Sequence, residues 1–333
     1  MIAHGGALDK AIAEFGGGRG DWIDLSTGIN PIGYPLPNLP QHIWQRLPDR
    51  NVEQAALESA RAYYGVPEKA GLVAAPGTQA LIQLYPHLAP PGNAVVIGPT
   101  YEEHTQALGM AGRDVRYERS FAAVDADDMI VVVVNPNNPD GRVMPVDALL
   151  FMADQLAERG GLLVVDEAFA DTDPTISVAR HAEADGLLVL KSFGKFFGLA
   201  GVRLGFAAGP SPLTNVLSSM LGPWAVSGPA LAIAAKAYAD VHAIAGMRAD
   251  LANKRKTMAA LLGECGLTVI GGTDLFVLAR HFQATHIQRS LCDQHILVRK
   301  FDYQADWLRF GLPFDDAAFQ RLRIVLSQIM VAL

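Results

Sequence analysis

The hydrophobic positions of this 333-residue chain fall into short apolar runs separated by longer amphipathic segments. The runs show no polar alternation, which is typical of strands buried on both faces. The segments between them have helical spacing, as at residues 52–64 and 148–159. This pattern predicts an α/β fold in which helices cover both faces of a mostly parallel sheet. The runs expected to form its strands are residues 72–75, 94–97, 115–117, 129–134, 162–165, 187–190 and 204–207.

The pattern predicts three parts along the chain. Residues 1–40 are rich in Gly and Pro and predict an extended arm with one short helix near residues 8–15. Residues 41–225 carry the alternating strands and helices of a large domain. Residues 226–333 begin after a proline-rich boundary with an Ala-rich helix, continue with short strands and end in a last helix, and they predict a smaller α+β domain.

Composition and charge narrow the class of protein. There are 27 basic and 34 acidic residues, a net charge of -7, and no long basic run, which argues against nucleic-acid and anionic-membrane partners. No apolar run approaches the length of a membrane span, and the first residues lack the pattern of a secretory signal. Two cysteines cannot form a disulfide framework. We therefore expect a cytoplasmic protein.

Several predicted strands are followed directly by residues that could bind a ligand or take part in catalysis. These residues are Gly77, Tyr101, Asn138, Asp166 and Lys195. In a parallel sheet the carboxyl ends of the strands share one edge, and ligands bind beyond that edge. The spacing therefore predicts that these residues form one site.

Lys195 is the centre of this predicted site. It lies in the stretch 191–205, which is rich in Gly and aromatic residues and is expected to be a loop. Apolar neighbours disfavour the ammonium form and lower the pKa of the amine, and a neutral amine is what Schiff-base chemistry needs. Ser192 and Arg203 could hold a phosphate beside it.

Taken singly, each of these residues has an ordinary structural explanation. Lys195 could be a surface lysine, Asp166 could cap a turn, Asn138 could be a turn residue and Tyr101 could be a packing residue. Thr78 could be only an N-cap, although the helix that it opens presents backbone N–H groups to an anion. No metal site is expected, because the nine histidines show no ligand spacing.

Together, the motifs resemble the fold-type-I pyridoxal-phosphate enzymes of the class I and II aminotransferase family. They are Asn138-Pro139-x-Gly141, Asp166-Glu167-Ala168-Phe169, and Ser192-x-x-Lys195 followed by Arg203. Each motif is weak alone, but the ordered set is specific, and the resemblance spans nearly the whole chain. It implies the fold-type-I transferase fold, with a large domain around a seven-stranded, mostly parallel sheet, a smaller C-terminal α+β domain, and a homodimer.

The resemblance also implies a cofactor, pyridoxal 5'-phosphate, and a role for each residue. Lys195 would form the Schiff base, Asp166 would pair with the protonated ring nitrogen, and Tyr101 would stack on the ring; these three are the expected catalytic residues. Asn138 would contact the phenolic oxygen, and Arg309 would clamp the substrate carboxylate. The residues expected to bind the cofactor phosphate are Gly77, Thr78, Gln79, Ser192 and Arg203.

Two positions depart from the family pattern. Many relatives have a tyrosine at the position of Phe169, where its hydroxyl also touches the phenolic oxygen of the cofactor. Close relatives have a tyrosine at the position of Leu47, which reaches the cofactor phosphate of the partner subunit. Phe169 and Leu47 lack those hydroxyl groups.

Within the family, the opening residues His4-Gly5-Gly6 and the segment 25–33 look like the decarboxylases of cobalamin biosynthesis that act on threonine phosphate. Those enzymes release CO2 from L-threonine O-3-phosphate and form (R)-1-amino-2-propanol O-2-phosphate, so the expected partner is a phosphorylated amino acid. The candidate substrate-binding residues are His4, Gly28, Asn30, Arg299 and Arg309.

Two alternatives stay open. One is a histidinol-phosphate aminotransferase or related aminotransferase, because the choice of reaction depends on which Cα bond lies perpendicular to the cofactor ring, and the sequence does not show that geometry. The other is a non-catalytic regulatory or partner-binding domain, against which the intact Lys195, Asp166 and Arg203 argue.

Overall fold

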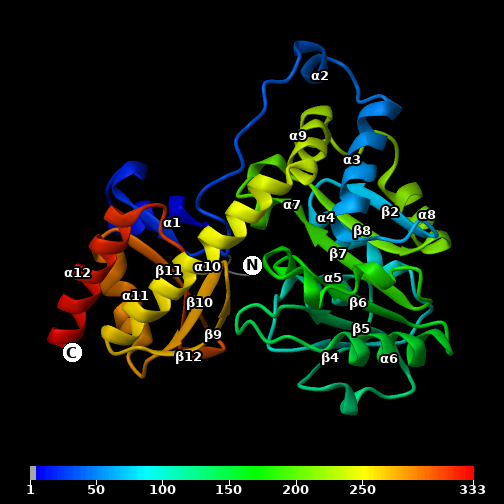
Figure 1. Cartoon of the computed structure of the whole chain (residues 1–333). Coiled ribbons are helices and arrows are strands. Elements are labelled where there is room, and N and C mark those ends of the chain that lie inside the picture. Colours follow the sequence, from blue (N-terminus) through cyan, green and yellow to red (C-terminus); the bar gives the residue numbers. More distant parts are fainter. Residues whose placement is uncertain (1–4) are drawn as a thin grey trace. The chain divides into compact units, whose positions relative to one another are not determined.

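The structure, a computed structural model, describes residues 5–333 (Figure 1). It divides into two compact units, each made of separate chain segments. The large unit consists of Tyr34–Asn138 and Arg142–Ala245. The small unit consists of residues 5–33, Pro139–Gly141 and Gly246–Leu333. The division into an arm and two domains at residues 40 and 225 stays a prediction.

The large unit is built around a seven-stranded sheet with the order β2-β8-β7-β6-β5-β3-β4. Strands β7, β6, β5, β3 and β4 are parallel to one another, whereas β8 is antiparallel to both β7 and β2. The predicted seven-stranded, mostly parallel sheet is therefore confirmed. Its strands are β2 (Ala70–Ala75), β3 (Asn93–Ile97), β4 (Val115–Glu118), β5 (Asp128–Val134), β6 (Leu162–Asp166), β7 (Leu187–Ser192) and β8 (Gly205–Pro210).

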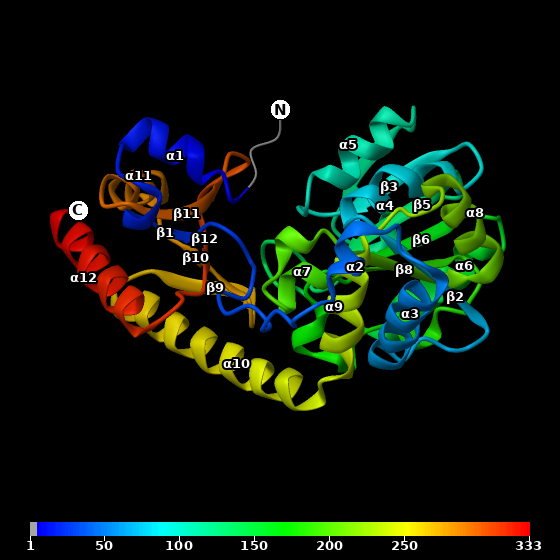
Figure 2. The ribbon, with the colours of Figure 1, turned by 90° about the horizontal axis from the view of Figure 1, so that it is seen from above.

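Helices bury both faces of this sheet, which explains the apolar runs in its central strands. Helices α4 (Thr78–Leu84), α5 (Glu103–Met110) and α8 (Ser211–Leu221) pack on one face, in a core that includes Val132, Val164 and Leu188. On the other face, rings from α3 and α9 contact Phe206 of β8. The remaining large-unit elements are α2 (Gln41–Gln45), α3 (Arg50–Tyr64), α6 (Val146–Ala157) and α9 (Gly228–Ala239), of which α3 and α9 lie side by side (Figures 1 and 2).

The segment around Lys195 differs from the predicted loop. Residues Phe193–Phe196 form a single helical turn, α7, and Ala200–Val202 form a 3-10 turn. Gly194 does not break this helix, because its role is steric: a Cβ atom there would lie 2.7 Å from the Cα atom of Ala200. The glycine lets the two turns pack against each other, which fixes the position of the turn that carries Lys195.

The small unit contains a five-stranded sheet with the order β1-β11-β12-β10-β9. Its first strand comes from the predicted arm and pairs in parallel with β11; the other pairs are antiparallel. Helices α11 and α12 contact each other beside this sheet (Figure 2). The elements are α1 (Leu8–Phe15), β1 (Ile23–Leu25), β9 (Thr268–Thr273), β10 (Phe276–Arg280), α11 (Ala284–Asp293), β11 (Ile296–Phe301), β12 (Gln304–Gly311) and α12 (Asp316–Ala332).

Helix α10 (Val241–Glu264) belongs to both units and follows α9 after one intervening residue, Asp240. The Ala-rich helix predicted from the sequence is thus two helices, and the break lies just before the expected position at 241–247. Across residues 5–333, no helix has the length and apolar character needed to cross a bilayer. The same residues contain no group of three or more His, Cys, Asp or Glu side chains placed to hold a metal ion.

Candidate active site

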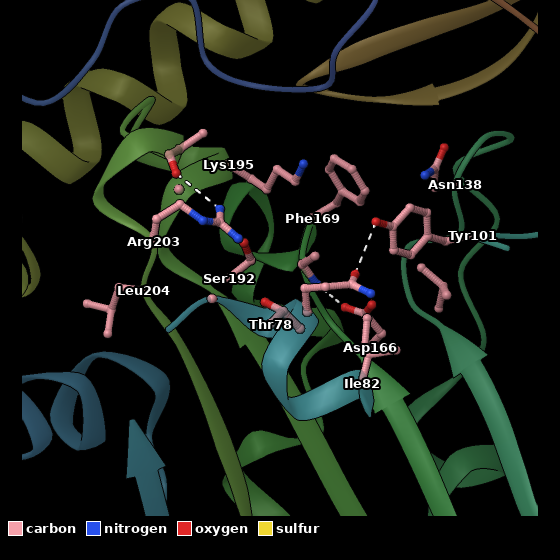
Figure 3. A pocket seen from close by; sticks show the side chains of 16 residues that line it. Thr78, Ile82, Tyr101, Asn138, Asp166, Phe169, Ser192, Lys195, Arg203 and Leu204 are labelled. Atoms are coloured by element: carbon pink, nitrogen blue, oxygen red, sulfur yellow. Dashed lines mark hydrogen bonds between the residues drawn. The ribbon is translucent and has the colours of Figure 1, made fainter. Parts of the chain in front are cut away.

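A cavity of about 160 Å³ lies at the edge of the large sheet where the parallel strands end (Figure 3). A single water needs only roughly 10–15 Å³, so the cavity has room for a larger ligand. The structure places all nine residues expected to bind the cofactor around this one cavity. They are Gly77, Thr78, Gln79, Tyr101, Asn138, Asp166, Ser192, Lys195 and Arg203.

The direction of the strands explains why these residues meet. Asp166 is the last residue of β6 and Ser192 the last of β7, while Tyr101 and Asn138 follow β3 and β5. Strand β8 runs the opposite way, so Arg203, which precedes it, reaches the same edge. The sequence expectation that strand-end residues form one site is therefore met by the geometry.

Asp166 is held as an oriented acceptor at the base of the cavity. Its side chain is buried; its Oδ1 accepts a hydrogen bond from the N–H of Ala168 at 3.0 Å, and its Oδ2 lies 3.0 Å from Nε2 of His104. A carboxylate can accept about four hydrogen bonds, so these two leave capacity for a cationic N–H donor in the cavity. A buried carboxylate without a cation is costly, which favours such a ligand.

His104 is fixed from its other side by Tyr85. The Tyr85 hydroxyl lies 3.0 Å from Nδ1 of His104, and both side chains are fully buried. Burial raises the pKa of Tyr85 well above its usual range, and the charge of Asp166 raises it further, so the hydroxyl keeps its proton. Tyr85 then donates to Nδ1, and Nε2–H donates to Asp166.

Lys195 lies on a rigid base of aromatic rings. Phe193, Phe196 and Phe197 are fully buried, and the rings of Phe193 and Phe197 stack with centroids 4.7 Å apart. Lys195 is half-buried, and its Nζ lies 5.7 Å from the centroid of the Phe169 ring (Figure 3). These buried rings support α7, the turn that carries Lys195.

The opposite end of the cavity is shaped for an anion. Gly77 has φ 84°, a conformation that favours glycine, and a Cβ atom there would lie 2.7 Å from Nη2 of Arg203, so a side chain at this position would displace the guanidinium. Arg203 itself has φ 55° and donates from Nη1 to the carbonyl of Ala200 at 3.2 Å. Ser192 lines the same cavity and adds a hydroxyl. A guanidinium and a hydroxyl together suit a phosphate.

Two side chains have structural roles that the sequence did not reveal. The Thr78 hydroxyl donates to the backbone carbonyl of Lys191 at 3.2 Å, which leaves its backbone N–H as the group that can face an anion. The amide of Gln79 donates to Glu103 at 2.6 Å and accepts from the Tyr101 hydroxyl at 3.4 Å. Gln79 therefore holds the Tyr101 ring in place at the cavity.

The candidate substrate residues lie in the small unit, with the exception of His4, which lies outside the described residues. Arg309 is buried and donates to the carbonyl of Ser26 at 2.8 Å, and its guanidinium carbon lies 5.0 Å from the centroid of the Phe276 ring. The Oδ1 atom of Asn30 accepts from the N–H of Ile32 at 3.0 Å. Gly28 is buried and lies in the segment between β1 and Asn30.

Arg299 and Arg309 face each other across β11 and β12. Burial, and after it the positive charge of Arg299, lower the pKa of Arg309 to about 10. Like charges placed directly opposite in a sheet destabilise it. An anion bound between the two guanidinium groups would relieve that cost, so this pair suits a carboxylate or phosphate ligand.

Sequence reasoning missed His104, Tyr85 and a second buried pair, Glu167 and Lys191. For the first of these, the only signal was its place three residues after Tyr101; Tyr101 itself precedes α5, which begins at Glu103 and carries His104. Glu167 and Lys191 flank predicted site residues, but strand alternation turns them to the other face of the sheet.

The sequence matches the family described as aminotransferase class I and II over residues 21–323. It is 47% identical over 331 residues to a threonine-phosphate decarboxylase of Sinorhizobium sp., covering 98% of each chain. It is 41% identical over 326 residues to the threonine-phosphate decarboxylase of Pseudomonas aeruginosa, covering 97% of this chain and 96% of that one. It is 30% identical to histidinol-phosphate aminotransferase 1 of Cupriavidus pinatubonensis, covering 95% and 91%.

Solved structures share the fold. The histidinol-phosphate aminotransferase of Clostridium acetobutylicum superposes with a TM-score of 0.81 at 20% identity, covering 93% of this chain and 99% of that one. The L-threonine-O-3-phosphate decarboxylase of Porphyromonas gingivalis superposes with a TM-score of 0.75 at 16% identity, covering 92% and 99%. At these identities, the two structures support the fold alone.

Proposed function

Because the chain belongs to the class I and II aminotransferase family, we propose that it is a pyridoxal-phosphate-dependent carboxy-lyase acting on L-threonine O-3-phosphate. The products are CO2 and (R)-1-amino-2-propanol O-2-phosphate, and the reaction belongs to cobalamin biosynthesis in the cytoplasm. The observation that carries the proposal is the near-full-length similarity to two threonine-phosphate decarboxylases.

The cavity in the large unit fits the cofactor. Asp166 is a buried acceptor for a protonated ring nitrogen, and Arg203 and Ser192 offer a cation and a hydroxyl for its phosphate. Tyr101 would stack on the ring, and Asn138 would meet the phenolic oxygen without help from Phe169, which has no hydroxyl. When bound, pyridoxal phosphate supplies an electron sink for the electron pair left on Cα.

The residues of the chain then have separate tasks. Asp166, oriented by His104, keeps the ring nitrogen protonated through its charge. Lys195 would hold the cofactor covalently through its amine, and the same amine is the group of the chain that would deliver a proton to Cα. Arg309 binds and orients the substrate carboxylate, which decides whether the bond to that group can break.

The substrate phosphate needs donors of its own. We assign it to Arg299, with the Asn30 side chain, the backbone at Gly28 and His4 as further contacts. Arg299 faces Arg309 across the strand pair, so one ligand with both a carboxylate and a phosphate would neutralise both charges. A phosphorylated amino acid has this arrangement of anions.

A homodimer is part of the proposal. Large apolar side chains are exposed on the large unit at Leu36, Trp44, Leu47 and Trp224, with exposed fractions between 59% and 67%. Helix α2, which carries Trp44, contacts α9. Exposed aromatic residues of this kind mark protein interfaces. We expect light scattering to give the mass of a dimer and Trp44→Glu to shift the protein toward monomer; a wild-type monomer would contradict this part of the proposal.

The alternative reaction, amino transfer, can be tested directly. The holoenzyme is given either L-threonine O-3-phosphate or histidinol phosphate, each with and without 2-oxoglutarate. The proposal expects CO2 from threonine phosphate without 2-oxoglutarate, and little glutamate from either substrate. Glutamate formed from histidinol phosphate, with no CO2 from threonine phosphate, would instead establish an aminotransferase.

A further inference from the structure

A buried ion pair lies on the far side of the sheet from the cavity, directly behind it. Strands β6 and β7 are parallel, with Asp166 opposite Leu190. Glu167 directly follows the last residue of β6, Lys191 lies on β7, and the N–H of Glu167 donates to the carbonyl of Leu190 at 2.9 Å, which continues the pairing of the two strands by one residue. Because neighbouring side chains alternate between faces, Asp166 and Ser192 face the cavity while Glu167 and Lys191 point the other way.

The pair is fully removed from water. Glu167 is 0% and Lys191 2% exposed, and Nζ of Lys191 lies 2.5 Å from Oε2 of Glu167. The Ser177 hydroxyl donates to Oε2 and accepts from Nζ at 3.1 Å. The N–H of Val178 donates to Oε1 at 2.7 Å, and Nζ lies 4.6 Å from the centroid of the Tyr64 ring. Both charges are therefore paired and hydrogen-bonded.

The pair joins three segments that carry or support the cavity wall. Glu167 lies between Asp166 and the cavity residues Ala168 and Phe169. Lys191 precedes Ser192 and the helical turn of Lys195. Ser177 and Val178 lie at the far end of the segment that begins at Phe169, and their hydrogen bonds to Glu167 tie that end to the strand. The contacts at one carboxylate thus set where each of these segments lies relative to the others.

Stability alone does not account for the pair. Desolvating two charges costs several kcal/mol, and well-packed apolar residues often give an equal or more stable core. Apolar residues fill the neighbouring positions, because Val165 and Val189 are both fully buried. What an ion pair adds is a fixed geometry, because its hydrogen bonds are directional whereas apolar contacts are not.

We propose that Glu167 and Lys191 form a positioning pair that holds Asp166 at the correct separation from Ser192 and Lys195 for the cofactor. The proposal rests on the proposed function, since it takes the cavity as the pyridoxal-phosphate site. It assigns no contact with the cofactor to either residue. The pair acts through the two strand ends, so its loss is expected to reduce the affinity for the cofactor more than the stability of the fold.

The test uses a neutral pair of similar size, Glu167→Gln with Lys191→Met in one protein, which leaves no unpaired charge. The pyridoxal-phosphate dissociation constant, the visible absorbance of the bound cofactor and the melting temperature of the apoprotein are measured. We expect the dissociation constant to rise on the order of tenfold or more, as for misplaced site groups, with a shifted absorbance band. The matched control is Val189→Ala, which creates a cavity on the same face of β7; its melting temperature should fall with the dissociation constant unchanged.

The result that overturns the proposal is a wild-type dissociation constant and absorbance in the double variant, or a loss of affinity that follows the melting temperature as it does in Val189→Ala. If the double variant does not fold, Ser177→Ala serves instead, because it removes only the bridging hydroxyl. A several-fold weaker cofactor affinity supports the pair, and an unchanged affinity overturns it. A failure of the proposed function is distinct, because the wild-type protein itself would then bind no pyridoxal phosphate.

Discussion

The imidazole of His104 lies 3.0 Å from Asp166, measured from Nε2 to Oδ2, and 3.0 Å from the Tyr85 hydroxyl on its other side. This buried chain orients the carboxylate that faces the cavity. The tautomer that satisfies all three groups has the proton on Nε2.

Tyr85→Phe removes the outer member of this chain and leaves Nδ1 of His104 buried without its donor. An unsatisfied buried polar group costs about 1–3 kcal/mol. We therefore expect the free energy of unfolding in urea to fall by that amount and the cofactor affinity to fall with it. The comparison variant is Tyr117→Phe, whose hydroxyl lies at an exposed position. Equal stability of the two variants would contradict the role given to Tyr85.

Gly77→Ala tests the approach of Arg203 to the anion end of the cavity. The new Cβ atom would lie 2.7 Å from Nη2 of Arg203, and φ 84° is strained for alanine by roughly 1–2 kcal/mol. We expect weaker binding of pyridoxal phosphate in a titration followed by absorbance. Gly109→Ala is the control, since nothing lies within 4 Å of its Cβ position in α5. Wild-type affinity in Gly77→Ala would show that the guanidinium is not needed there.

Arg309→Lys tests the proposed carboxylate clamp. A charge-assisted, bidentate interaction is replaced by a single point charge, a loss of about 1.5–3 kcal/mol, which corresponds to on the order of tenfold or more in binding. We expect a higher KM for threonine phosphate with little change in cofactor affinity. Arg323→Lys, at an exposed ion pair with Glu264, should leave KM unchanged. A KM equal to that of the wild type would remove Arg309 from substrate binding.

Three buried tyrosines predict that stability falls at alkaline pH. Burial raises the pKa of Tyr64, Tyr85 and Tyr238 well above the ordinary value of 10.0, and nearby carboxylates add to the shift. Above pH 10 the unfolded chain loses these protons while the folded protein keeps them. Stability therefore falls as pH rises, by up to about 1.4 kcal/mol per pH unit for each tyrosine.

Arg309 has the opposite effect on stability, because its pKa is lowered to about 10 in the folded protein. Above that pH the folded protein loses this proton while the unfolded chain keeps it, so this one group makes stability rise with pH. Denaturant unfolding at several pH values above 10 measures the net slope. In the double variant Tyr64→Phe/Tyr238→Phe the slope should become shallower, whatever its starting stability. An unchanged slope would mean that the two hydroxyls do not keep their protons in the folded protein.

The large sheet and the residues that line the cavity could be predicted from the sequence. Short apolar runs such as 129–134 and 162–165 are typical of buried strands, and parallel strands bring their ends to one edge. The side chains that support the cavity from behind could not be predicted from the sequence. The sequence around Tyr85 and Lys191 does not indicate which buried residue each side chain contacts, because those contacts join positions far apart in the chain.

The turn at Lys195 shows why local signals can mislead. Gly194 reads as a helix breaker in a loop, yet it lies inside α7 because the turn at Ala200 needs the space of its missing side chain. Tertiary packing therefore decided the local structure. The same packing, with Phe193 and Phe197 stacked below, holds the lysine at the cavity.

The most direct test of the account follows the carboxyl carbon. Holoenzyme is incubated with L-threonine O-3-phosphate labelled at that carbon, without any 2-oxo acid, and labelled CO2 and the amine phosphate are measured together. The account predicts equal amounts of the two products over many turnovers, and neither product from Lys195→Ala, which should also lack the visible colour of the bound cofactor. Retention of the label in the amino-acid carbon skeleton, with turnover only when 2-oxoglutarate is added, would contradict it.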